Sequence, residues 1–393
     1  MVHSDLKELF FALVRLGIGH QLVSSLKFQV SSEVDWVQLK ALADQHGLSA
    51  VVLDGIDLAT DPKHSTLNTQ LKLEWIGEVL QNYEARYKQY EKAIGNLAGW
   101  YNRHGFRMMV LKGYACAMNW PRPEHRPCGD IDIWLFGQQR EADALLESSE
   151  FRVESLETVE KVKRIKVDNS HHHHTVFEWE GFTVENHYDF LNVHHHKSNV
   201  EMEKVLKELG MDDSNSVEFR VESLESVESG EKRVVSVPVY LPSANLHALF
   251  LLRHAMSNFA STGCNLRQLL DWAFCVEKHG KEIDWEWLER QLAHFGMKRL
   301  YDVFNAICVG DLGFDVHVFP QVQFDPALKD RVLNDILEPE FSEKETGGFF
   351  SRAFFKYRRW KANAWKHELC FSESLWSAFW SGVWGHLMKP GMI

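Results

Sequence analysis

The chain has 393 residues and carries 43 Lys and Arg against 55 Asp and Glu, a net charge of −12. A wholly basic nucleic-acid or membrane-surface protein is excluded, because no overall positive field would attract polyanions. Hydrophobic residues make up 45% of the chain, enough to bury a substantial core, and the length predicts two or three domains. No apolar run approaches the ~18 residues of a membrane span, so we expect a soluble, cytoplasmic protein without integral membrane association.

The six cysteines are scattered along the chain without a CxxC pair. This spacing is typical of reduced, mostly buried thiols, and it does not suggest a disulfide framework or a zinc knuckle.

Residues 1–105 form the expected helical N-terminal region. From about Leu67 to Arg103 apolar residues recur every three or four positions, which is the period of one buried helix face. The stretch DWVQLKALADQ at 35–45, followed by Gly47, predicts a further helix with a glycine stop.

From residue 106 to residue 199 the pattern indicates strands. MMVLKG at 108–113 and IDIWLF at 131–136 are short apolar runs, the second preceded by a turn-forming stretch rich in proline. HHHHTVFEW and FTVENHYDF are separated by Glu180-Gly181, which suits a tight hairpin. We therefore expect a small sheet here, with a helix at 138–149 packed on it.

The segment 200–233 is strongly acidic and contains EFRVESLESVE at 218–228, a near copy of EFRVESLETVE at 150–160. Its composition predicts a mobile insertion, with an ordered helical or strand excursion as the alternative. After it, residues 234–340 return to the helical period, with Ser243 as an expected N-cap, and form a predicted C-terminal helical domain.

The most informative residues are Gly129-Asp130-Ile131-Asp132-Ile133. On a strand, alternation places Asp130 and Asp132 together on one face and the two isoleucines on the other. Two carboxylates so close repel each other, and a divalent cation between them relieves that repulsion. Replacing either aspartate by asparagine is therefore expected to leave the metal-free stability equal or slightly higher. An ordinary exposed strand face is the alternative, since the motif alone is common.

The setting favours a metal site. Upstream, Lys112-Gly113-Tyr114 ends one strand and begins a short helix, and Arg126 precedes the two aspartates. Downstream, a strand presents Glu185 and His187 on one face. A glycine turn, paired aspartates and a later carboxylate are the parts of a two-metal phosphoryl-transfer site.

These residues also carry a resemblance. The runs LKGYACAMNWPRPEHRPCGDIDIWL, VENHYDF and NLRQLLDWAF resemble the uncharacterised nucleotidyltransferase family of the DNA polymerase beta-like superfamily, over roughly residues 30–315. The resemblance implies an α+β fold, in which a polymerase beta-like core with a small mixed sheet is flanked by N- and C-terminal helical domains. Asp130 and Asp132 match the paired aspartates of the family, Glu185 its third carboxylate, and Gly113 the glycine of its phosphate-binding turn.

One departure concerns Tyr114, because many members of the superfamily have serine after the glycine. Lys112 and Arg126 could supply the missing charge for phosphates, although a lysine at a strand end is often an ordinary surface residue. The predicted nucleotide-binding residues are Lys112, Gly113, Tyr114, Arg126 and Gly129.

The expected reaction is transfer of a nucleoside monophosphate from an NTP to an acceptor. Asp130 and Asp132 would hold Mg²⁺ or Mn²⁺, and Glu185 would ligate the metal near the acceptor or take its proton. His187 could assist, or could be a structural histidine. The acidic composition favours a small molecule or a protein over a long nucleic acid as acceptor. A catalytically silent nucleotide-binding module and a metal-dependent phosphohydrolase are the alternatives.

Three further patterns have structural and functional interpretations. The histidine tracts 171–174 and 194–196 are expected on the hairpin surface or the rim of the site, although a strand would allow His171 and His173 to share zinc. Arg267 and Asp271 have the spacing of a helical salt bridge, with closure of an acceptor pocket as a second role.

The last pattern is the tail, residues 341–393, where a basic cluster precedes an aromatic stripe. Its aromatic and apolar members at helical spacing are Trp376, Phe379, Trp380, Trp384 and Leu387. Stacking on single-stranded nucleic acid and lying on a membrane are alternatives. We favour docking on the body of the protein or on a second copy, which makes the tail a candidate surface for homo-oligomers.

Overall fold

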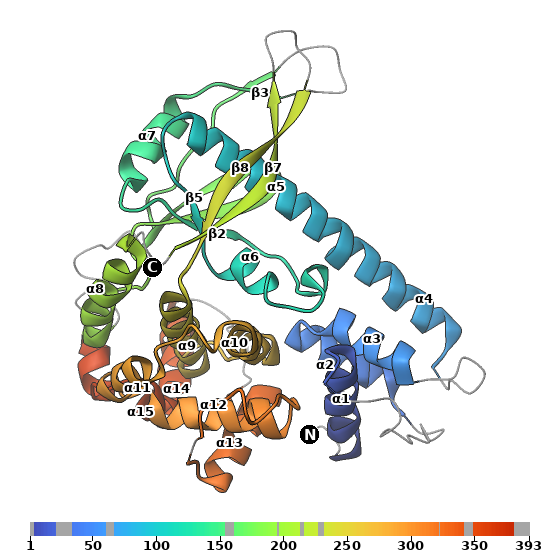
Figure 1. The fold of residues 1–393 in the computed structure, drawn as a ribbon. Coiled ribbons are helices and arrows are strands. Elements are labelled where there is room, and N and C mark those ends of the chain that lie inside the picture. Colours follow the sequence, from blue (N-terminus) through green and yellow to red (C-terminus); the bar gives the residue numbers. More distant parts are fainter. Residues whose placement is uncertain are drawn as a thin grey trace. The chain divides into compact units, whose positions relative to one another are not determined.

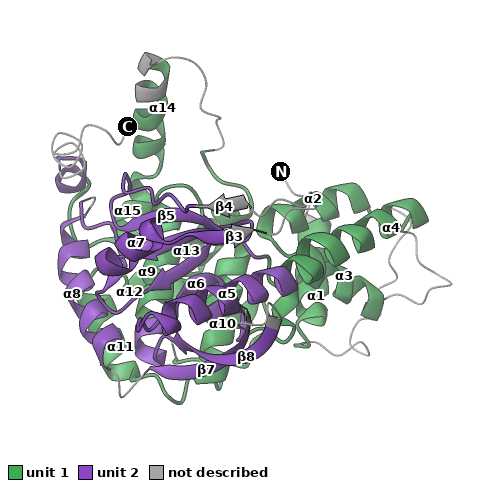
Figure 2. Cartoon of the chain, turned by 90° about the horizontal axis from the view of Figure 1, so that it is seen from above, with its two compact units in different colours: residues 1–86, 119–127, 248–375 green, residues 87–118, 128–247, 376–393 purple. Residues whose placement is uncertain are grey.

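A computed structural model describes residues 4–20, 34–59, 67–153, 161–194, 196–212, 216–226, 232–321, 323–341 and 349–380. The chain divides into two compact units, each assembled from segments distant in the sequence (Figure 2). The first unit comprises residues 1–86, 119–127 and 248–375, and the second comprises 87–118, 128–247 and 376–393. No helix in the described residues has both the length and the apolar character needed to cross a membrane.

The first unit is helical (Figure 1). From the N-terminal part of the chain it takes α1 (Ser4–Gly17), α2 (Trp36–His46), α3 (Ser49–Ala59), α4 (Thr69–Glu78) and a π-helical segment (Val79–Ala85). From the C-terminal part it takes most of α9 (Ala244–Ala260), then α10 (Leu266–His279), α11 (Trp285–His294), α12 (Lys298–Gly310), α13 (Pro326–Leu337), α14 (Phe349–Ala362) and α15 (Ala364–Cys370).

These two helical groups form one unit, so the expectation of two separate flanking helical domains is wrong. Hydrogen bonds join the groups: Arg15 Nη1 donates to the Asp311 carbonyl at 2.8 Å, and Gln45 Nε2 donates to the Leu337 carbonyl at 3.2 Å. Polar groups that leave water need such partners, and here the partners come from the far end of the chain.

The second unit is built on a six-stranded mixed sheet with the strand order β5–β6–β2–β1–β8–β7. Its strands are β1 (Met109–Val110), β2 (Ile131–Trp134), β5 (His174–Trp179), β6 (Phe182–His187), β7 (Val217–Ser226) and β8 (Lys232–Leu241). β2 pairs with β6, and β1 with β8, in parallel, while the other neighbours are antiparallel. A separate two-stranded sheet joins β3 (Phe151–Val153) to β4 (Lys161–Lys163). The predicted hairpin turn is confirmed, because Glu180 and Gly181 both have positive φ and connect β5 to β6.

The helices of this unit are α5 (Arg86–Arg103), α6 (Lys112–Ala117), α7 (Gln139–Ser148) and α8 (Lys197–Met211). Tyr90, Ile94 and Leu97 of α5 belong to the same buried core as Ile131 and Ile133 of β2. The helical stripe predicted from Leu67 to Arg103 therefore spans both units, and the boundary falls at residue 86, not at 105.

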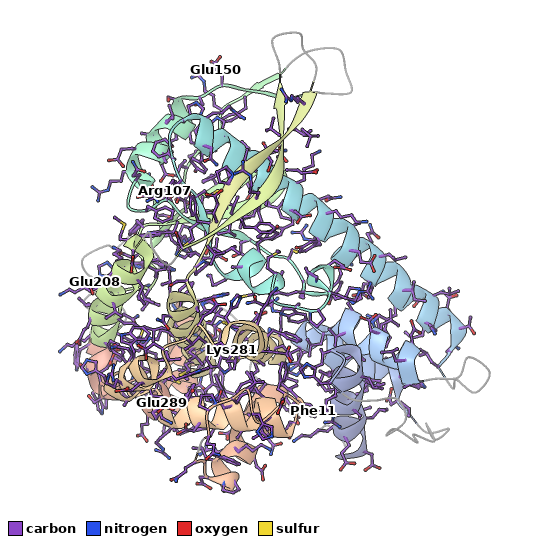
Figure 3. All side chains as sticks on the ribbon, viewed as in Figure 1. Phe11, Arg107, Glu150, Glu208, Lys281 and Glu289 are labelled. Atoms are coloured by element: carbon purple, nitrogen blue, oxygen red, sulfur yellow. The ribbon has the colours of Figure 1, made fainter. Side chains whose placement is uncertain are left out.

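The residues of β2 are all buried and alternate between the two faces of the sheet. Ile131 and Ile133 enter the core, whereas Asp132 between them does not, as strand alternation requires. Two residues after the end of β2, the ring centre of Phe136 lies 4.2 Å from the guanidinium of Arg107, which is labelled in Figure 3.

The acidic segment 200–233 is ordered structure over most of its length, so the mobile insertion is wrong and the ordered alternative holds. It contains most of α8 and all of β7, which pairs with β8 over ten residues. Alternation explains why the composition was misleading: β7 buries one face, with Val221 in the core, and exposes Glu218 and Glu222 on the other. The loop residues 213–215 and 227–231, like 154–160 of the near copy, lie outside the described residues.

The tail begins with α14 and α15, and α15 is held to α13 by a buried ion pair of 2.6 Å between Lys366 and Asp335. Trp376 and Trp380 of the aromatic stripe are 63% and 64% exposed. These two tryptophans are therefore largely exposed, and the predicted docking of the stripe stays a prediction. Trp384 and Leu387 lie outside the described residues, and self-association through the tail stays a prediction.

Close packing of α5 on β7 gives a test of the ordered segment. A Cβ atom added at Gly95 would lie 1.9 Å from the Glu222 carbonyl oxygen. Gly95→Ala should therefore destabilise the protein by about 2 kcal/mol or more in thermal unfolding, although alanine favours helix.

Gly77→Ala is the matched control, because a Cβ atom at this exposed position of α4 meets nothing within 4 Å. It should stabilise the protein by about 0.5 to 1 kcal/mol. A stabilising effect of both substitutions would show that β7 does not pack against α5.

Candidate functional site

The turn from β1 into α6 brings a lysine to the sheet. β1 and β2 are antiparallel, and the Leu111 amide donates to the Asp132 carbonyl at 2.9 Å. Lys112 then opens α6 beside that strand. The absence of a side chain at Gly113 has a packing reason, because a Cβ atom there would lie 2.4 Å from the hydroxyl of Tyr90. That hydroxyl donates to the Asp130 carbonyl at 2.9 Å and so fixes the start of β2.

Two carboxylates meet where β2 pairs with β6. The parallel register places Asp132 directly beside Glu185, and side chains at paired positions share a face of the sheet. Glu185 and His187, two residues apart on β6, share that face as well. The predicted juxtaposition of Asp132, Glu185 and His187 is thus present, and their ligand atoms lie within 4.8 Å of one another.

Two basic side chains balance this negative charge. Lys112 Nζ lies 2.6 Å from Asp132 Oδ1, and His187 Nε2 lies 3.1 Å from the same oxygen. His187 Nε2 is also 3.6 Å from Glu185 Oε2. We call Lys112, Asp130, Asp132, Glu185 and His187 the carboxylate cluster. Because Asp132 and His187 are buried, these contacts are screened little by solvent.

The contacts set the ionisation states. Burial raises the pKa of Asp132, but the Lys112 ammonium and the His187 hydrogen bond outweigh it and hold that pKa well below its usual range. The pKa of Glu185 is likewise lowered, with the His187 contact outweighing burial. Burial lowers the pKa values of Lys112 and His187, but the carboxylates raise both overall. The contacts therefore favour the ionised form of Asp132 and Glu185 and the protonated form of Lys112 and His187.

Asp130 has a different environment. It is exposed at the start of β2, and no basic side chain forms a close ion pair with it among the contacts of the described residues. Partial removal from water and repulsion by Asp132 raise the pKa of its carboxyl. A cation shared by Asp130 and Asp132 would relieve that repulsion.

Histidines from the predicted tract lie beside these carboxylates. His174 pairs in register with His187, and its Nδ1 atom lies 3.6 Å from Glu185 Oε2. Burial lowers the pKa of His173 to about 2 and that of His174 to about 4, so both rings are neutral at pH 7. The sequence predicted these histidines on the hairpin surface or the rim of the site. The position of His174 against Glu185 follows from strand register and was not apparent in the sequence.

The loop after β6 is held by a buried acid of α8. The carboxylate of Glu203 accepts hydrogen bonds from the Phe190 amide at 3.0 Å and the Leu191 amide at 2.9 Å. The Asp189 carbonyl in the same loop lies 3.1 Å from His187 Nδ1, which donates to it in the protonated ring. Glu203 therefore helps to orient the imidazole that contacts both carboxylates.

Two further residues of the predicted nucleotide-binding set, Tyr114 and Gly129, are not members of the carboxylate cluster. Tyr114 is buried, and its hydroxyl donates to Glu91 Oε1 of α5 at 3.0 Å. Burial raises its pKa, so this hydroxyl is no candidate for proton transfer. Gly129 lies in an exposed turn with open space around its Cα.

Arg126 belongs to the helical unit and is engaged there. Its Nε and Nη2 atoms lie 2.7 and 2.9 Å from the two oxygens of Asp271, a bidentate pair. Trp120 donates to Asp271 as well, at 2.9 Å. Asp271 therefore pairs closely with Arg126, and Arg267, four residues before it, also helps to lower the pKa of its carboxyl.

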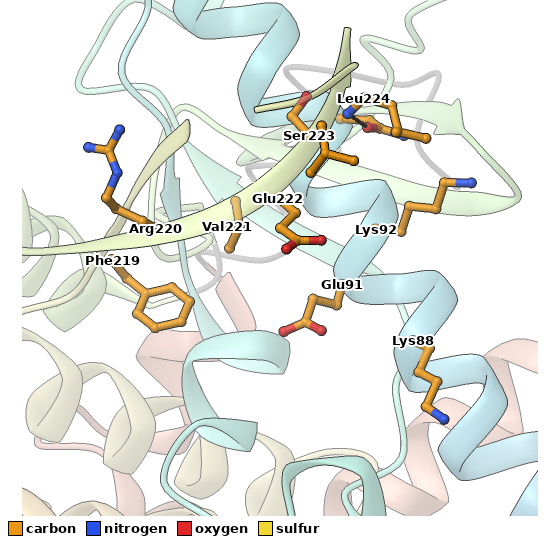
Figure 4. A pocket seen from close by; sticks show the side chains of 11 residues that line it. Lys88, Glu91, Lys92, Phe219, Arg220, Val221, Glu222, Ser223 and Leu224 are labelled. Atoms are coloured by element: carbon orange, nitrogen blue, oxygen red, sulfur yellow. Dashed lines mark hydrogen bonds between the residues drawn. The ribbon is translucent and has the colours of Figure 1, made fainter. Parts of the chain in front are cut away.

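A pocket of about 380 Å³ lies between α5 and β7 of the second unit (Figure 4). Glu91 and Glu222 face each other across it, and Lys88, Lys92 and Arg220 contribute charge to its lining. No member of the carboxylate cluster lines it. The pocket is therefore lined by residues other than those of the carboxylate cluster.

Comparison with known proteins gives one match. A family model described as "Uncharacterised nucleotidyltransferase" matches residues 32–309, more than two thirds of the chain. No curated protein and no solved structure matches. The matched range includes the whole carboxylate cluster as well as Arg126 and Asp271.

The ion pairs of Asp132 contradict the expectation that replacing either aspartate by asparagine leaves the metal-free stability equal or slightly higher. Asp132→Asn removes the charge that faces Lys112 and His187, so it should destabilise the metal-free protein by about 3 kcal/mol in denaturant unfolding. Asp130→Asn removes a repelled charge and should change stability by no more than about 0.5 kcal/mol, or increase it slightly. Equal stabilisation by both substitutions would show that repulsion dominates at Asp132 too.

Glu203 predicts a dependence of stability on pH. Burial raises the pKa of Glu203 to about 7 from an unfolded value near 4.5, so the folded state binds the extra proton between these values. The free energy of unfolding should therefore fall as pH rises from 4.5 to 7, by about 3 kcal/mol from this group, and then level off.

The matched variant Glu203→Gln cannot ionise, so its difference from the wild type isolates this contribution. A wild-type-minus-variant difference that stays constant from pH 4.5 to 8 would contradict the assignment.

Proposed function

This chain belongs to the uncharacterised nucleotidyltransferase family, and from that premise we propose that its carboxylate cluster binds a divalent metal ion and an NTP for transfer of a nucleoside monophosphate to an acceptor. The observation that carries the proposal is the register of β2 and β6, which sets Asp132 beside Glu185. Asp130, two residues before Asp132, supplies the third carboxylate.

The donor set fits Mg²⁺ or Mn²⁺. Both ions prefer carboxylate oxygens, and Mg²⁺ in particular takes few protein ligands and completes its shell with water and phosphate. Asp132 and Glu185 are ionised at neutral pH, as metal ligands must be. When bound, such an ion neutralises phosphate charge and aligns the reacting oxygens.

Lys112 is the cation we assign to the phosphates of the NTP. The predicted nucleotide-binding set contains two basic residues. Lys112 contacts Asp132, whereas Arg126 forms an ion pair with Asp271. The side chain of Lys112 is 17% exposed, so it can reach an anion from its place beside Asp132. Because Tyr114 is buried against α5, only the backbone of the turn at Gly113 and Tyr114 can add contacts.

Glu185 and His187 take different roles in this proposal. The Glu185 side chain is 22% exposed and can ligate the metal near the acceptor or accept its proton. His187 is 1% exposed and contacts both Asp132 and Glu185, which makes it a positioning residue. The polymerase beta-like core is part of the same proposal, supported by the order of β1, the α6 turn, the aspartates of β2 and the carboxylate of β6.

The acceptor we propose is a small molecule or a protein. The overall charge of −12 opposes binding of a long polyanion, and the described residues of the carboxylate cluster include a single lysine and no arginine.

Incubation with each α-labelled NTP, Mg²⁺ or Mn²⁺, and cell lysate should transfer label to one class of acceptor. Asp130→Asn and Asp132→Asn should reduce this transfer by ~10²-fold or more, because each removes a ligand that acts in the transition state. Label on no molecule, with inorganic phosphate released, would favour the phosphohydrolase instead.

Binding alone gives a second readout. Mg²⁺ and NTP together at about 100 times the dissociation constant should stabilise the fold by ~2.7 kcal/mol in thermal denaturation, with much smaller effects of either alone. Glu185→Gln should lose the joint effect. Equal stabilisation by NTP in the presence of a chelator would support the silent nucleotide-binding module and contradict a metal-bridged site.

A further inference from the structure

We propose that His173, His174 and His187 form a binding site for a transition-metal ion of the zinc class, separate in its chemistry from the proposed Mg²⁺ site. The three residues each offer one ring nitrogen, and these ligand atoms lie within 4.8 Å of one another. We call them the histidine group. The inference stands on this geometry and does not depend on the proposed transfer reaction.

Strand pairing brings the histidine group together. His174 opens β5 and His187 closes β6, and the antiparallel register makes them direct partners on one face. His173 precedes β5, and its carbonyl accepts the amides of Tyr188 and Asp189, which fixes its backbone against the loop after β6. The ring centres of His173 and His174 lie 5.4 and 5.2 Å from that of His187.

Two ring nitrogens of the group are buried without a hydrogen-bond partner. They are Nδ1 of His173 and Nδ1 of His174, and the His174 residue is 7% exposed. A buried polar atom left in this state is unfavourable unless a ligand or water satisfies it. A metal ion is the ligand that two neutral imidazole nitrogens would share, because each presents a lone pair.

The other ring nitrogen of His187 also has a partner. His187 Nδ1 lies 3.1 Å from the Asp189 carbonyl, so a hydrogen bond there directs Nε2 toward the other ligands. Histidines that bind metals commonly have such a partner on the second nitrogen. Glu185 Oε2, 3.6 Å from both His174 Nδ1 and His187 Nε2, is available as an oxygen ligand.

This donor set selects an ion other than Mg²⁺. Three imidazoles with one carboxylate suit Zn²⁺ and its substitute Co²⁺, whereas Mg²⁺ favours oxygen ligands and water. The rival explanation is loose chelation by the tract itself, since the exposed His171 stacks on His174 and the exposed His194 lies next to His172. The two explanations differ in which histidines binding requires.

The test is a Co²⁺ titration of the full, untagged chain, stripped with chelator and free of nucleotide, followed by visible d–d absorption and by competition with Zn²⁺. We expect one equivalent to bind. His173→Gln and His174→Gln should weaken binding at least ~10-fold, while His171→Gln, the exposed neighbour in the same tract, should leave it unchanged. An equal loss in His171→Gln and His174→Gln would overturn the site in favour of tract chelation.

X-ray absorption of the Zn²⁺-loaded wild type covers the case in which a variant fails to fold. We expect about three nitrogen ligands at ~2.0 to 2.1 Å, with imidazole scattering. A shell of oxygen ligands alone would overturn the proposal. Neither experiment contains NTP, so loss of transfer activity and loss of this site are separate outcomes. Asp130→Asn should reduce transfer by ~10²-fold or more while leaving Co²⁺ binding intact.

Discussion

The parallel pairing of β2 with β6 imposes the main electrostatic constraint on this protein. It sets Asp132 beside Glu185 on a partly buried face, where repulsion between carboxylates is screened little by water. Lys112 and His187 supply the compensating charge through contacts with the same Asp132 oxygen. The surrounding structure then serves to place these two bases: Gly113 lets α6 begin against Tyr90, and Glu203 holds the loop that contacts His187.

The same charge balance bears on the proposed metal site. Basic partners keep Asp132 and Glu185 ionised. A divalent ion would compete with those partners, Lys112 and His187, for the carboxylate oxygens. Metal affinity would therefore depend on how readily Lys112 turns to another anion, and the phosphates of an NTP provide one. This links metal binding to nucleotide binding through a single side chain. The histidine group lies on the imidazole side of the same cluster, where nitrogen ligands replace oxygen.

Much of the local structure could be predicted from the sequence, because it depends on short periods and turn residues. Alternation on β2 and the hairpin at Glu180-Gly181 were correct, and so was the placement of Glu185 and His187 on one face. The order of β7 was missed, since a strand buried on one side can carry acidic residues on the other. The partner of Arg126 and the packing of Tyr114 on α5 depend on contacts between distant segments, which no local pattern encodes. The contact of His174 with Glu185 likewise depends on the register of β5 and β6, which no local pattern encodes.

The most direct test of the central claim is a crystal structure with Mn²⁺ and a non-hydrolysable NTP, measured at a wavelength that locates manganese by its anomalous signal. The account predicts a manganese peak within coordination distance of Asp130, Asp132 and Glu185, with the Lys112 ammonium moved from Asp132 toward a phosphate oxygen. A nucleotide bound elsewhere, with the Lys112–Asp132 contact intact and no manganese at the three carboxylates, would contradict it.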